Sequence, residues 1–168
     1  ILRSDWSSDV CSSDLESADE LPKGNEPVDE LIGKKFIMYI GRPTPHKNLR
    51  RLIDAFALLQ KKYPDLTLAL AGKKDSNYAR HETYVNEHGI KNVVFTGFIS
   101  DEQLRWMYEN TAVYCFPSLS EGFGLPGLEA MLHGAPVASS TATCLPETHG
   151  DAAHYFDPFS VEDIAKSI

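Results

Sequence analysis

Short apolar runs alternate with segments of helical periodicity along most of this chain. Six runs predict strands, and the last of them is the weakest. They occupy residues 35–41, 66–72, 93–96, 112–116, 136–139 and 153–156. The first run has no charged side chain from Phe36 to Ile40 and closes on Gly41, which is typical of a strand buried on both faces.

The segments between these runs predict helices. Apolar residues recur at helical spacing from Leu49 to Leu59, after Asn48 in a position that suits an N-cap. Ser100 and Gln103 form the pattern of a capping box. Further helices are expected over residues 79–88, 100–110 and 124–133, and another begins after Ser160. Strands that alternate with helices indicate an α/β fold with a parallel sheet covered on both faces.

Charge is distributed unevenly along the chain. Residues 1–31 hold nine acidic and two basic residues, so the formal net charge of −8 lies almost entirely there. The nearly neutral remainder argues against a general nucleic-acid surface. No apolar run approaches the roughly 20 residues that span a bilayer, and the N-terminus lacks the pattern of a signal peptide. We therefore expect a cytoplasmic protein that does not bind nucleic acid.

The N-terminal segment predicts no packed structure. Residues 1–15 repeat a Ser-Ser-Asp unit and resemble translated sequencing-adapter DNA, so we interpret them as an artefact. Residues 16–31 have the composition of a linker. The expected organisation is a disordered tail and linker over residues 1–31 and one domain over residues 32–168. The last predicted helix has no terminator, which indicates a domain truncated at its C-terminus.

The stretch from residue 117 to residue 130 carries the most chemical information. Glu121 and Glu129 bracket three glycines between a predicted strand and a predicted helix. The first N–H groups of a helix lack intrahelical partners and suit a diphosphate, which glycine lets approach closely. The carboxylates would repel phosphates, so we expect them to accept hydrogen bonds from sugar or ribose hydroxyls. Helix stability alone is an alternative explanation for Glu129.

Two cations stand in the first predicted strand-to-helix turn. Arg42 follows the strand and Lys47 precedes the helix, so both can face the edge where open α/β sheets bind ligands. Their side chains are suited to phosphate oxygens. The alternative for this pair taken alone is that both are solvated loop residues.

Other chemistries are less well supported. Residues 122–127 fit the G-x-G-x-x-G pattern of nicotinamide and flavin sites, but that motif belongs in the first strand-to-helix turn. Here it follows the fourth strand, and Glu147, near the expected acidic position, lies in a turn-like stretch. Neither an H-E-x-x-H nor an Asp-x-Asp pattern occurs, so no metal site is expected.

Together these residues resemble the C-terminal, donor-binding domain of the retaining GT-B glycosyltransferases of glycosyltransferase family 4. The resemblance covers residues 35–168. It rests on the Glu-x7-Glu motif from Glu121 to Glu129, on Gly41-Arg42 with Lys47, and on residues 145–158. It implies a Rossmann-like parallel sheet with helices on both faces, as in the C-terminal half of a GT-B fold.

The resemblance also assigns roles to individual residues. It implies that Arg42 and Lys47 grip the donor diphosphate, that Glu121 lies near the transferred sugar, and that Glu129 binds the ribose. Backbone N–H groups of residues 123–125 are expected near sugar and phosphate, and the nucleobase near residues 96–98. The implied donor site is Gly41, Arg42, Lys47, Phe98, Glu121, Gly122, Phe123, Gly124, Leu125 and Glu129. Of these, the resemblance makes Glu121, Arg42 and Lys47 the catalytic residues.

The activity implied is retaining, metal-independent transfer of a hexose from a nucleoside-diphosphate sugar to a glycan or lipid-linked acceptor. The sequence of residues 124–131 is similar to that of bacterial mannosyl- and rhamnosyltransferases of polysaccharide assembly, which favours GDP-mannose as donor. No cofactor is expected. An N-terminal domain would bring the acceptor, so we expect little transfer from this chain alone. Peripheral membrane contact is a further expectation for the full-length protein. The alternatives are a non-catalytic nucleotide- or sugar-binding module and a GT-B epimerase or phosphorylase relative.

Overall fold

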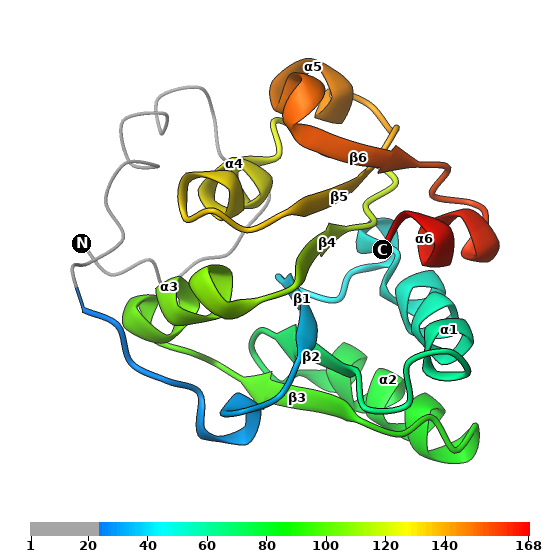
Figure 1. Ribbon diagram of the computed structural model, residues 1–168. Helices are drawn as coiled ribbons and strands as arrows, with labels where there is room; N and C mark the ends of the chain where they lie inside the picture. The colour runs from blue at the N-terminus through cyan, green and yellow to red at the C-terminus, as the bar shows by residue number, and fades with distance from the viewer. Residues whose placement is uncertain (1–23) are drawn as a thin grey trace.

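The computed structural model describes residues 24–168, which form a parallel sheet between two layers of helices (Figure 1). The six strands lie in the order β3-β2-β1-β4-β5-β6. They are β1 (Phe36–Ile40), β2 (Thr67–Ala71), β3 (Val93–Gly97), β4 (Val113–Phe116), β5 (Val137–Ser140) and β6 (Ala153–Phe156). Each neighbouring pair is parallel. This order confirms the predicted α/β, Rossmann-like fold.

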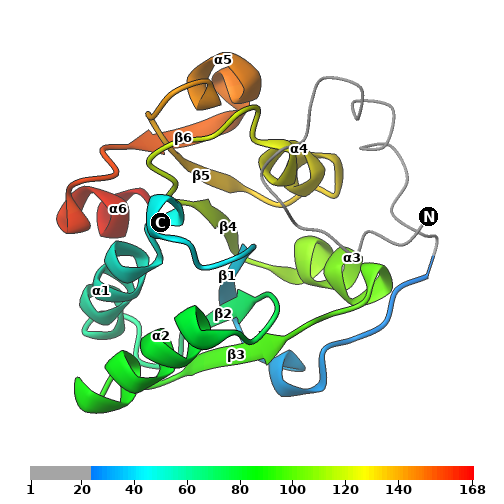
Figure 2. The same cartoon turned by 180° about the vertical axis from the view of Figure 1, so that it is seen from behind.

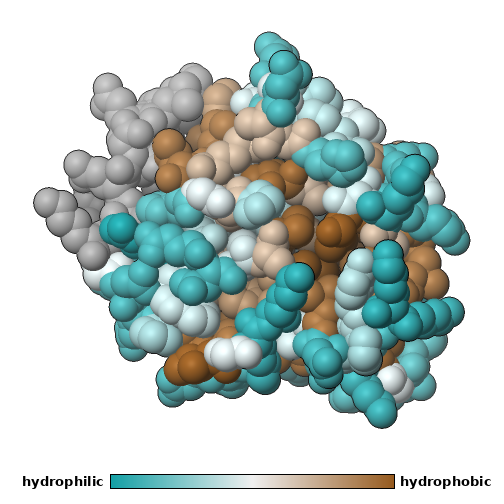
Figure 3. All heavy atoms as spheres, viewed as in Figure 1, coloured by the Kyte–Doolittle hydropathy of each residue, from teal (hydrophilic) through white to brown (hydrophobic). Residues whose placement is uncertain are grey.

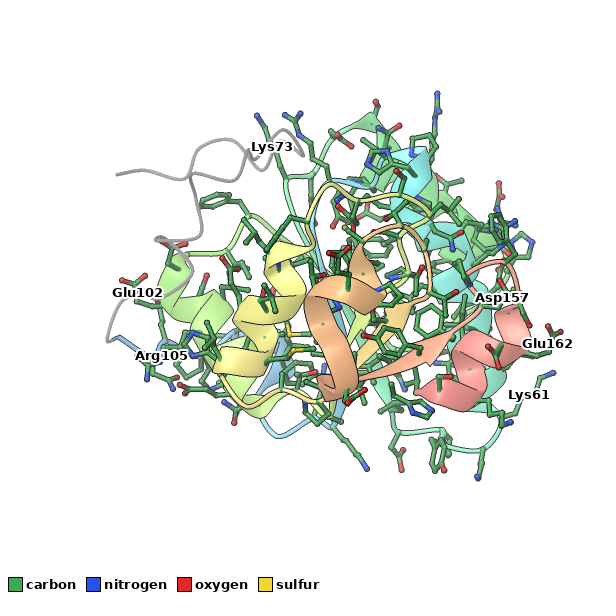
Figure 4. The ribbon with its side chains drawn as sticks, turned by 90° about the horizontal axis from the view of Figure 1, so that it is seen from above. Lys61, Lys73, Glu102, Arg105, Asp157 and Glu162 are labelled. Carbon is green, nitrogen blue, oxygen red and sulfur yellow. The ribbon has the colours of Figure 1, made fainter. Side chains whose placement is uncertain are left out.

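Helices cover both faces of the sheet (Figures 1 and 2). One face carries α1 (Leu49–Gln60), α2 (Ser76–Glu87) and α6 (Val161–Ser167). The other carries α3 (Asp101–Asn110), α4 (Leu125–Leu132) and α5 (Leu145–His149). Short 3-10 turns are η2 (Asp29–Leu31), η3 (Pro45–Lys47) and η4 (Gly150–Ala152). Seen from above, Glu102 and Arg105 on α3 lie on the opposite side of the molecule from Glu162 on α6 (Figure 4).

Strand β1 shows how one strand serves two cores. Its five side chains are all buried. Phe36, Met38 and Ile40 pack toward α3 and α4, whereas Ile37 and Tyr39 pack toward α1 and α2. Successive side chains of a strand point to opposite faces, so an unbroken apolar run supplies both layers at once.

The surface seen in Figure 3 is polar around most of its outline, and apolar side chains show mainly toward the middle. Large apolar side chains that remain exposed belong to separate segments of the chain. They are Ile32, Tyr63, Phe98, Leu132 and Phe159. Within residues 24–168, no helix is both long and apolar enough to cross a membrane.

Local capping explains where several helices begin. Ser100 Oγ accepts from the Gln103 N–H at 3.1 Å, and Gln103 Oε1 accepts from the Ser100 N–H at 3.1 Å, as the sequence predicts. Ser160 Oγ likewise accepts from the third residue of α6 at 3.1 Å. Helix α2 begins three residues earlier than predicted, because the side chain of Asp75 caps it by accepting two backbone N–H groups.

Two local predictions are wrong. Residues 145–149, which the sequence presents as turn-like, form α5, because Pro146 suits the first turn of a helix and Leu145 and His149 bury one side of it. Asn48 does precede α1, but its backbone is left-handed (φ 58°) and its side chain makes no capping bond. The side-chain amide of Asn48 is used elsewhere, as described below.

Part of the predicted linker also belongs to the domain. Val28 and Leu31 are 3% and 1% exposed and pack in the core beside α3, and the Glu26 N–H donates to Glu102 O at 3.4 Å. Burial of these two apolar side chains stabilises residues 24–31 against the body, which the composition of the segment does not reveal. Residues 1–23 lie outside the described residues.

Candidate functional site

The predicted site residues gather where the sheet order reverses. Strand β1 pairs with β2 on one side and with β4 on the other, with Met38 opposite Tyr114. The chain leaves β1 toward α1 on one face and leaves β4 toward α4 on the other face. Figure 2 shows the two connections leaving the same edge of the sheet. Open α/β sheets bind ligands at this switch point, outside the carboxyl ends of the strands.

Three contacts join the loop after β1 to the loop after β4. The Leu119 N–H donates to His46 O at 2.7 Å, and Asn48 Nδ2 donates to Pro117 O at 3.0 Å. The third contact is an ion pair between Lys47 Nζ and Glu121 Oε1 at 2.6 Å. The structure therefore brings together two of the predicted catalytic residues, which lie 74 positions apart in the sequence.

The Lys47–Glu121 pair is largely shielded from water. The side chains of Lys47 and Glu121 are 15% and 7% exposed. An ammonium donor and a carboxylate acceptor in such surroundings interact more strongly than they would on an open surface. The same two groups can bind a ligand that offers an anion to Lys47 and a hydroxyl donor to Glu121.

The glycine loop has backbone donors available. Among the described residues, the backbone N–H groups of Gly122, Phe123 and Gly124 find no acceptor. These groups precede the first turn of α4, and a Cβ on Gly122 would meet nothing within 4 Å. At exposed Gly122 the loop thus presents a polar hydrogen and partial positive charge to open space, whereas Gly124 is buried.

Gly124 and Gly127 are required by what lies beneath the loop. Gly124 has φ 91°, and a Cβ there would lie 2.6 Å from Leu145 Cδ2. A Cβ on Gly127 would overlap His149 Nε2 and lie 3.2 Å from Phe116 Cδ1. Both glycines therefore permit the loop and α4 to pack closely on α5, a reason distinct from ligand approach.

Glu129, the second carboxylate of the motif, lies on α4 and is 4% exposed. Burial raises the pKa of Tyr114 well above its usual value, and the nearby Tyr108, Glu121 and Glu129 raise that pKa further. Both motif carboxylates are thus close enough to Tyr114 on β4 to influence one hydroxyl. The role of Glu129 at a ribose stays a prediction.

His149 holds the backbone of the glycine loop at Gly124, although no pattern in the sequence singled it out. Its Nε2 lies 3.1 Å from Gly124 O and its Nδ1 lies 3.2 Å from Ser139 Oγ. A carbonyl oxygen can only accept, so Nε2 carries the hydrogen, and Nδ1 of the neutral ring accepts from the Ser139 hydroxyl. Burial lowers the pKa of His149, against the opposing effects of the Gly124 bond and the charge of Glu121.

We expect the free energy of unfolding to fall as pH drops below about 6.5, the pKa of an unfolded histidine. The unfolded chain takes up a proton in that range, whereas folded His149 resists protonation because its own pKa is lower. His81 and His133, whose pKa values burial also lowers, add to the same slope. Urea unfolding of the wild type and of His149→Gln between pH 5 and 8 would measure the effect. An unchanged slope in the variant would contradict it.

The remaining predicted residues lie along the same edge of the sheet. Arg42 is exposed and follows Gly41, and the Tyr39 hydroxyl donates to Arg42 O at 3.3 Å. Phe98, which is 68% exposed, follows β3 and is separated from β1 by β2. Figure 4 shows Lys73, which follows β2, on the side of the molecule opposite Lys61. In the described part of the chain, no group of three or more His, Cys, Asp or Glu side chains is arranged to hold a metal ion.

The family is decided by a profile comparison. The profile of the family described as "Glycosyl transferases group 1" matches residues 24–168. The chain belongs to this family. Over 144 residues it is 36% identical to the O-antigen chain mannosyltransferase B of Escherichia coli. The matched region covers 83% of this chain and 37% of that protein. The chain thus spans only about a third of that relative's length.

Two solved structures have the same fold. The C-terminal domain of a Glycosyl Transferase Group 1 Family Protein (LpcC) from Francisella tularensis has a TM-score of 0.70 and 30% identity, covering 82% of this chain and 75% of that chain. Anabaena Alr3699/HepE, solved in complex with UDP and glucose, has a TM-score of 0.71 and 25% identity, covering 82% and 38%. These GT-B neighbours confirm the predicted fold class.

Proposed function

We propose that this chain is the donor-binding part of a retaining glycosyltransferase of glycosyltransferase family 4. The observation that carries the proposal is the Lys47–Glu121 pair at the switch point, 2.6 Å apart and beside the glycine loop. A nucleoside-diphosphate sugar offers an anion and hydroxyl donors in one molecule. Lys47 and Arg42 would bind its diphosphate, Glu121 a hydroxyl of its sugar, and Glu129 its ribose.

The chemistry of transfer follows from the charge that develops. When the bond between the anomeric carbon and the diphosphate breaks, the electron pair goes to the leaving oxygen. In this proposal Lys47, Arg42 and the N–H groups at the start of α4 would stabilise that charge. In this proposal the domain promotes departure of the diphosphate without a metal ion or cofactor. The acceptor hydroxyl attacks from the same face with retention of configuration and passes its proton to the departing diphosphate oxygen.

The relatives support a hexose donor, with mannose favoured. The E. coli relative is named a mannosyltransferase of an O-antigen chain, and the Anabaena structure contains UDP and glucose. We propose GDP-mannose as the donor and a glycan or lipid-linked acceptor of polysaccharide assembly. The acceptor would be held by a further domain, in a cytoplasmic protein that contacts the membrane peripherally, so the chain alone would bind donor but transfer little.

Thermal unfolding of the chain in EDTA tests donor binding. A ligand at a hundredfold excess over its Kd adds about 2.7 kcal/mol, which is expected to raise Tm by roughly 5–10 °C for GDP-mannose. The same measurement is made separately with four alternative ligands, which are UDP-glucose, a dTDP-sugar, an ADP-sugar and NAD. Glu129→Gln, which keeps the shape of the side chain, should reduce the shift. A shift with NAD and none with any nucleotide sugar would contradict the proposal.

A transfer assay separates an enzyme from a binding module. The full-length protein is incubated with radiolabelled donor and a lipid-linked acceptor, and the product is tested for a new glycosidic bond. A glycoside with the donor's anomeric configuration would support the proposal. Donor binding without transfer would instead favour a non-catalytic module, and a free isomerised sugar an epimerase.

A further inference from the structure

The connection between β5 and α5 holds the backbone of Glu121. Thr143 Oγ1 accepts from the Glu121 N–H at 3.1 Å and donates to Glu121 O at 3.3 Å. A hydroxyl has one hydrogen and two acceptor sites, so both bonds form together. Cys144 Sγ donates to the same carbonyl at 3.4 Å. Two side chains more than 20 positions away therefore hold both backbone groups of one residue.

Thr143 makes these bonds from an unfavourable backbone conformation. Its φ is 52°, and the other described non-glycine residues with positive φ are Asn48 and Asn92. Asparagine tolerates the left-handed region, whereas a β-branched residue is rarely found there. Strain of this kind persists when surrounding interactions impose it, and it concentrates at functional sites.

The surrounding turn is fixed as well. Ser140 Oγ accepts from the Ala142 N–H at 2.9 Å, and Thr148 Oγ1 donates to Cys144 O at 3.1 Å. The turn is therefore anchored on β5 at one end and on α5 at the other. From this turn the Thr143 hydroxyl bonds the backbone of Glu121, and the carboxylate of Glu121 forms the ion pair with Lys47.

We propose that Thr143 is a positioning residue that fixes the backbone of Glu121 so that its carboxylate meets the sugar of the donor. The inference rests on the proposed function, in which Glu121 binds the transferred sugar. In this inference the strained backbone of Thr143 serves the site. Glu121 is followed by the flexible Gly122, and the two hydrogen bonds from Thr143 restrict where the carboxylate of Glu121 can lie.

The test compares variants at one position. Thr143→Val keeps the branched shape but removes both hydrogen bonds to Glu121. We expect amide hydrogen exchange at Glu121, followed by NMR without ligand, to accelerate about fivefold. Affinity for the nucleotide sugar, measured by calorimetry, should fall about fivefold, while affinity for the nucleoside diphosphate changes less than about twofold.

Two further substitutions separate positioning from general stability. Thr143→Ser restores the hydroxyl and should recover wild-type exchange and affinity. Thr143→Gly removes the hydroxyl but suits the positive φ, so Tm should stay within about 3 °C of the wild type while affinity for the nucleotide sugar falls. Thr141→Val, at an exposed neighbour in the same connection, is the matched control and should change neither readout.

The outcomes distinguish the two proposals. Wild-type exchange at Glu121 in Thr143→Val would overturn the positioning role, as would wild-type affinity for a donor that the native chain binds. If the native chain binds no nucleotide sugar, the proposed function fails. Faster exchange in Thr143→Val would then still support the hold on Glu121, and unchanged exchange would overturn it.

Discussion

Lys47→Met is expected to weaken binding of GDP-mannose by roughly 10- to 100-fold, because a hydrogen bond to a charged group is worth about 1.5–3 kcal/mol and each 1.4 kcal/mol is tenfold in Kd. Methionine keeps most of the length of the side chain and its apolar contacts. It removes the ammonium group that lies 2.6 Å from Glu121 and that would move to the donor diphosphate. Calorimetric titration of both chains with the same donor measures the difference.

A second lysine near the same edge supplies the control. Lys74 follows β2, its side chain is 57% exposed, and its Nζ lies 3.6 Å from Glu82. An exposed ion pair of this kind contributes little, so Lys74→Met should change the Kd less than about twofold. If the two variants lose affinity equally, general positive charge rather than the specific position of Lys47 would account for binding. Undiminished affinity in Lys47→Met would exclude its proposed role.

Gly72→Ala is expected to lower the free energy of unfolding by about 3 kcal/mol or more, since it combines backbone strain with overpacking. Gly72 has φ 153°, and a Cβ there would overlap the carbonyl oxygen of Gly41 and lie 2.7 Å from the Tyr78 hydroxyl. The single hydrogen of that hydroxyl is shared between Gly41 O and Ala71 O, which lie 3.0 and 2.8 Å from the Tyr78 oxygen. Backbone atoms cannot rotate aside as the end of a side chain can, so β1 and β2 must separate at their carboxyl ends.

Gly134→Ala is the matched control for that substitution. Gly134 has φ 77°, but a Cβ there would meet nothing within 4 Å. Only the strain of the left-handed backbone remains, which costs about 1–2 kcal/mol. Urea unfolding of both variants would compare them. Equal losses would show that the close approach of Gly72 to Gly41 has no additional effect, contrary to our expectation.

The sequence predicts those features that depend on neighbours along the chain. The strand at Phe36–Ile40 and the capping box at Ser100 and Gln103 are encoded within a few residues each, and the structure confirms both. Lys47 and Glu121 could also be proposed as partners in one site, because carboxyl ends of parallel strands share an edge. Their mutual ion pair could not be predicted, because it depends on the spacing of two loops.

Features that depend on distant packing were missed. Asn48 has the residue type and position of an N-cap, yet its amide is used by carbonyls from other loops. His149 shows no metal-ligand spacing, and its role comes from Gly124 and Ser139, which lie on other elements. Thr143 has no local motif at all, since both of its bonds go to Glu121 across 22 positions. Such pairings become visible only when the sheet brings the loops together.

The side chain of Asn48 links three loops at the carboxyl edge of the sheet through hydrogen bonds. Its Nδ2 donates to Pro117 O at 3.0 Å and to Pro158 O at 2.8 Å, while its Oδ1 accepts from Arg51 Nη1 at 2.9 Å. One side chain thus cross-links the loops after β1, β4 and β6, and Pro158 lies 110 positions away in the sequence. Phe159 follows Pro158 and is 66% exposed, and the centre of its ring lies 5.4 Å from the Arg51 guanidinium. We therefore expect a displacement of the loop that carries Lys47 to reach the surface at Phe159, where a spectroscopic label would report on the site without touching it.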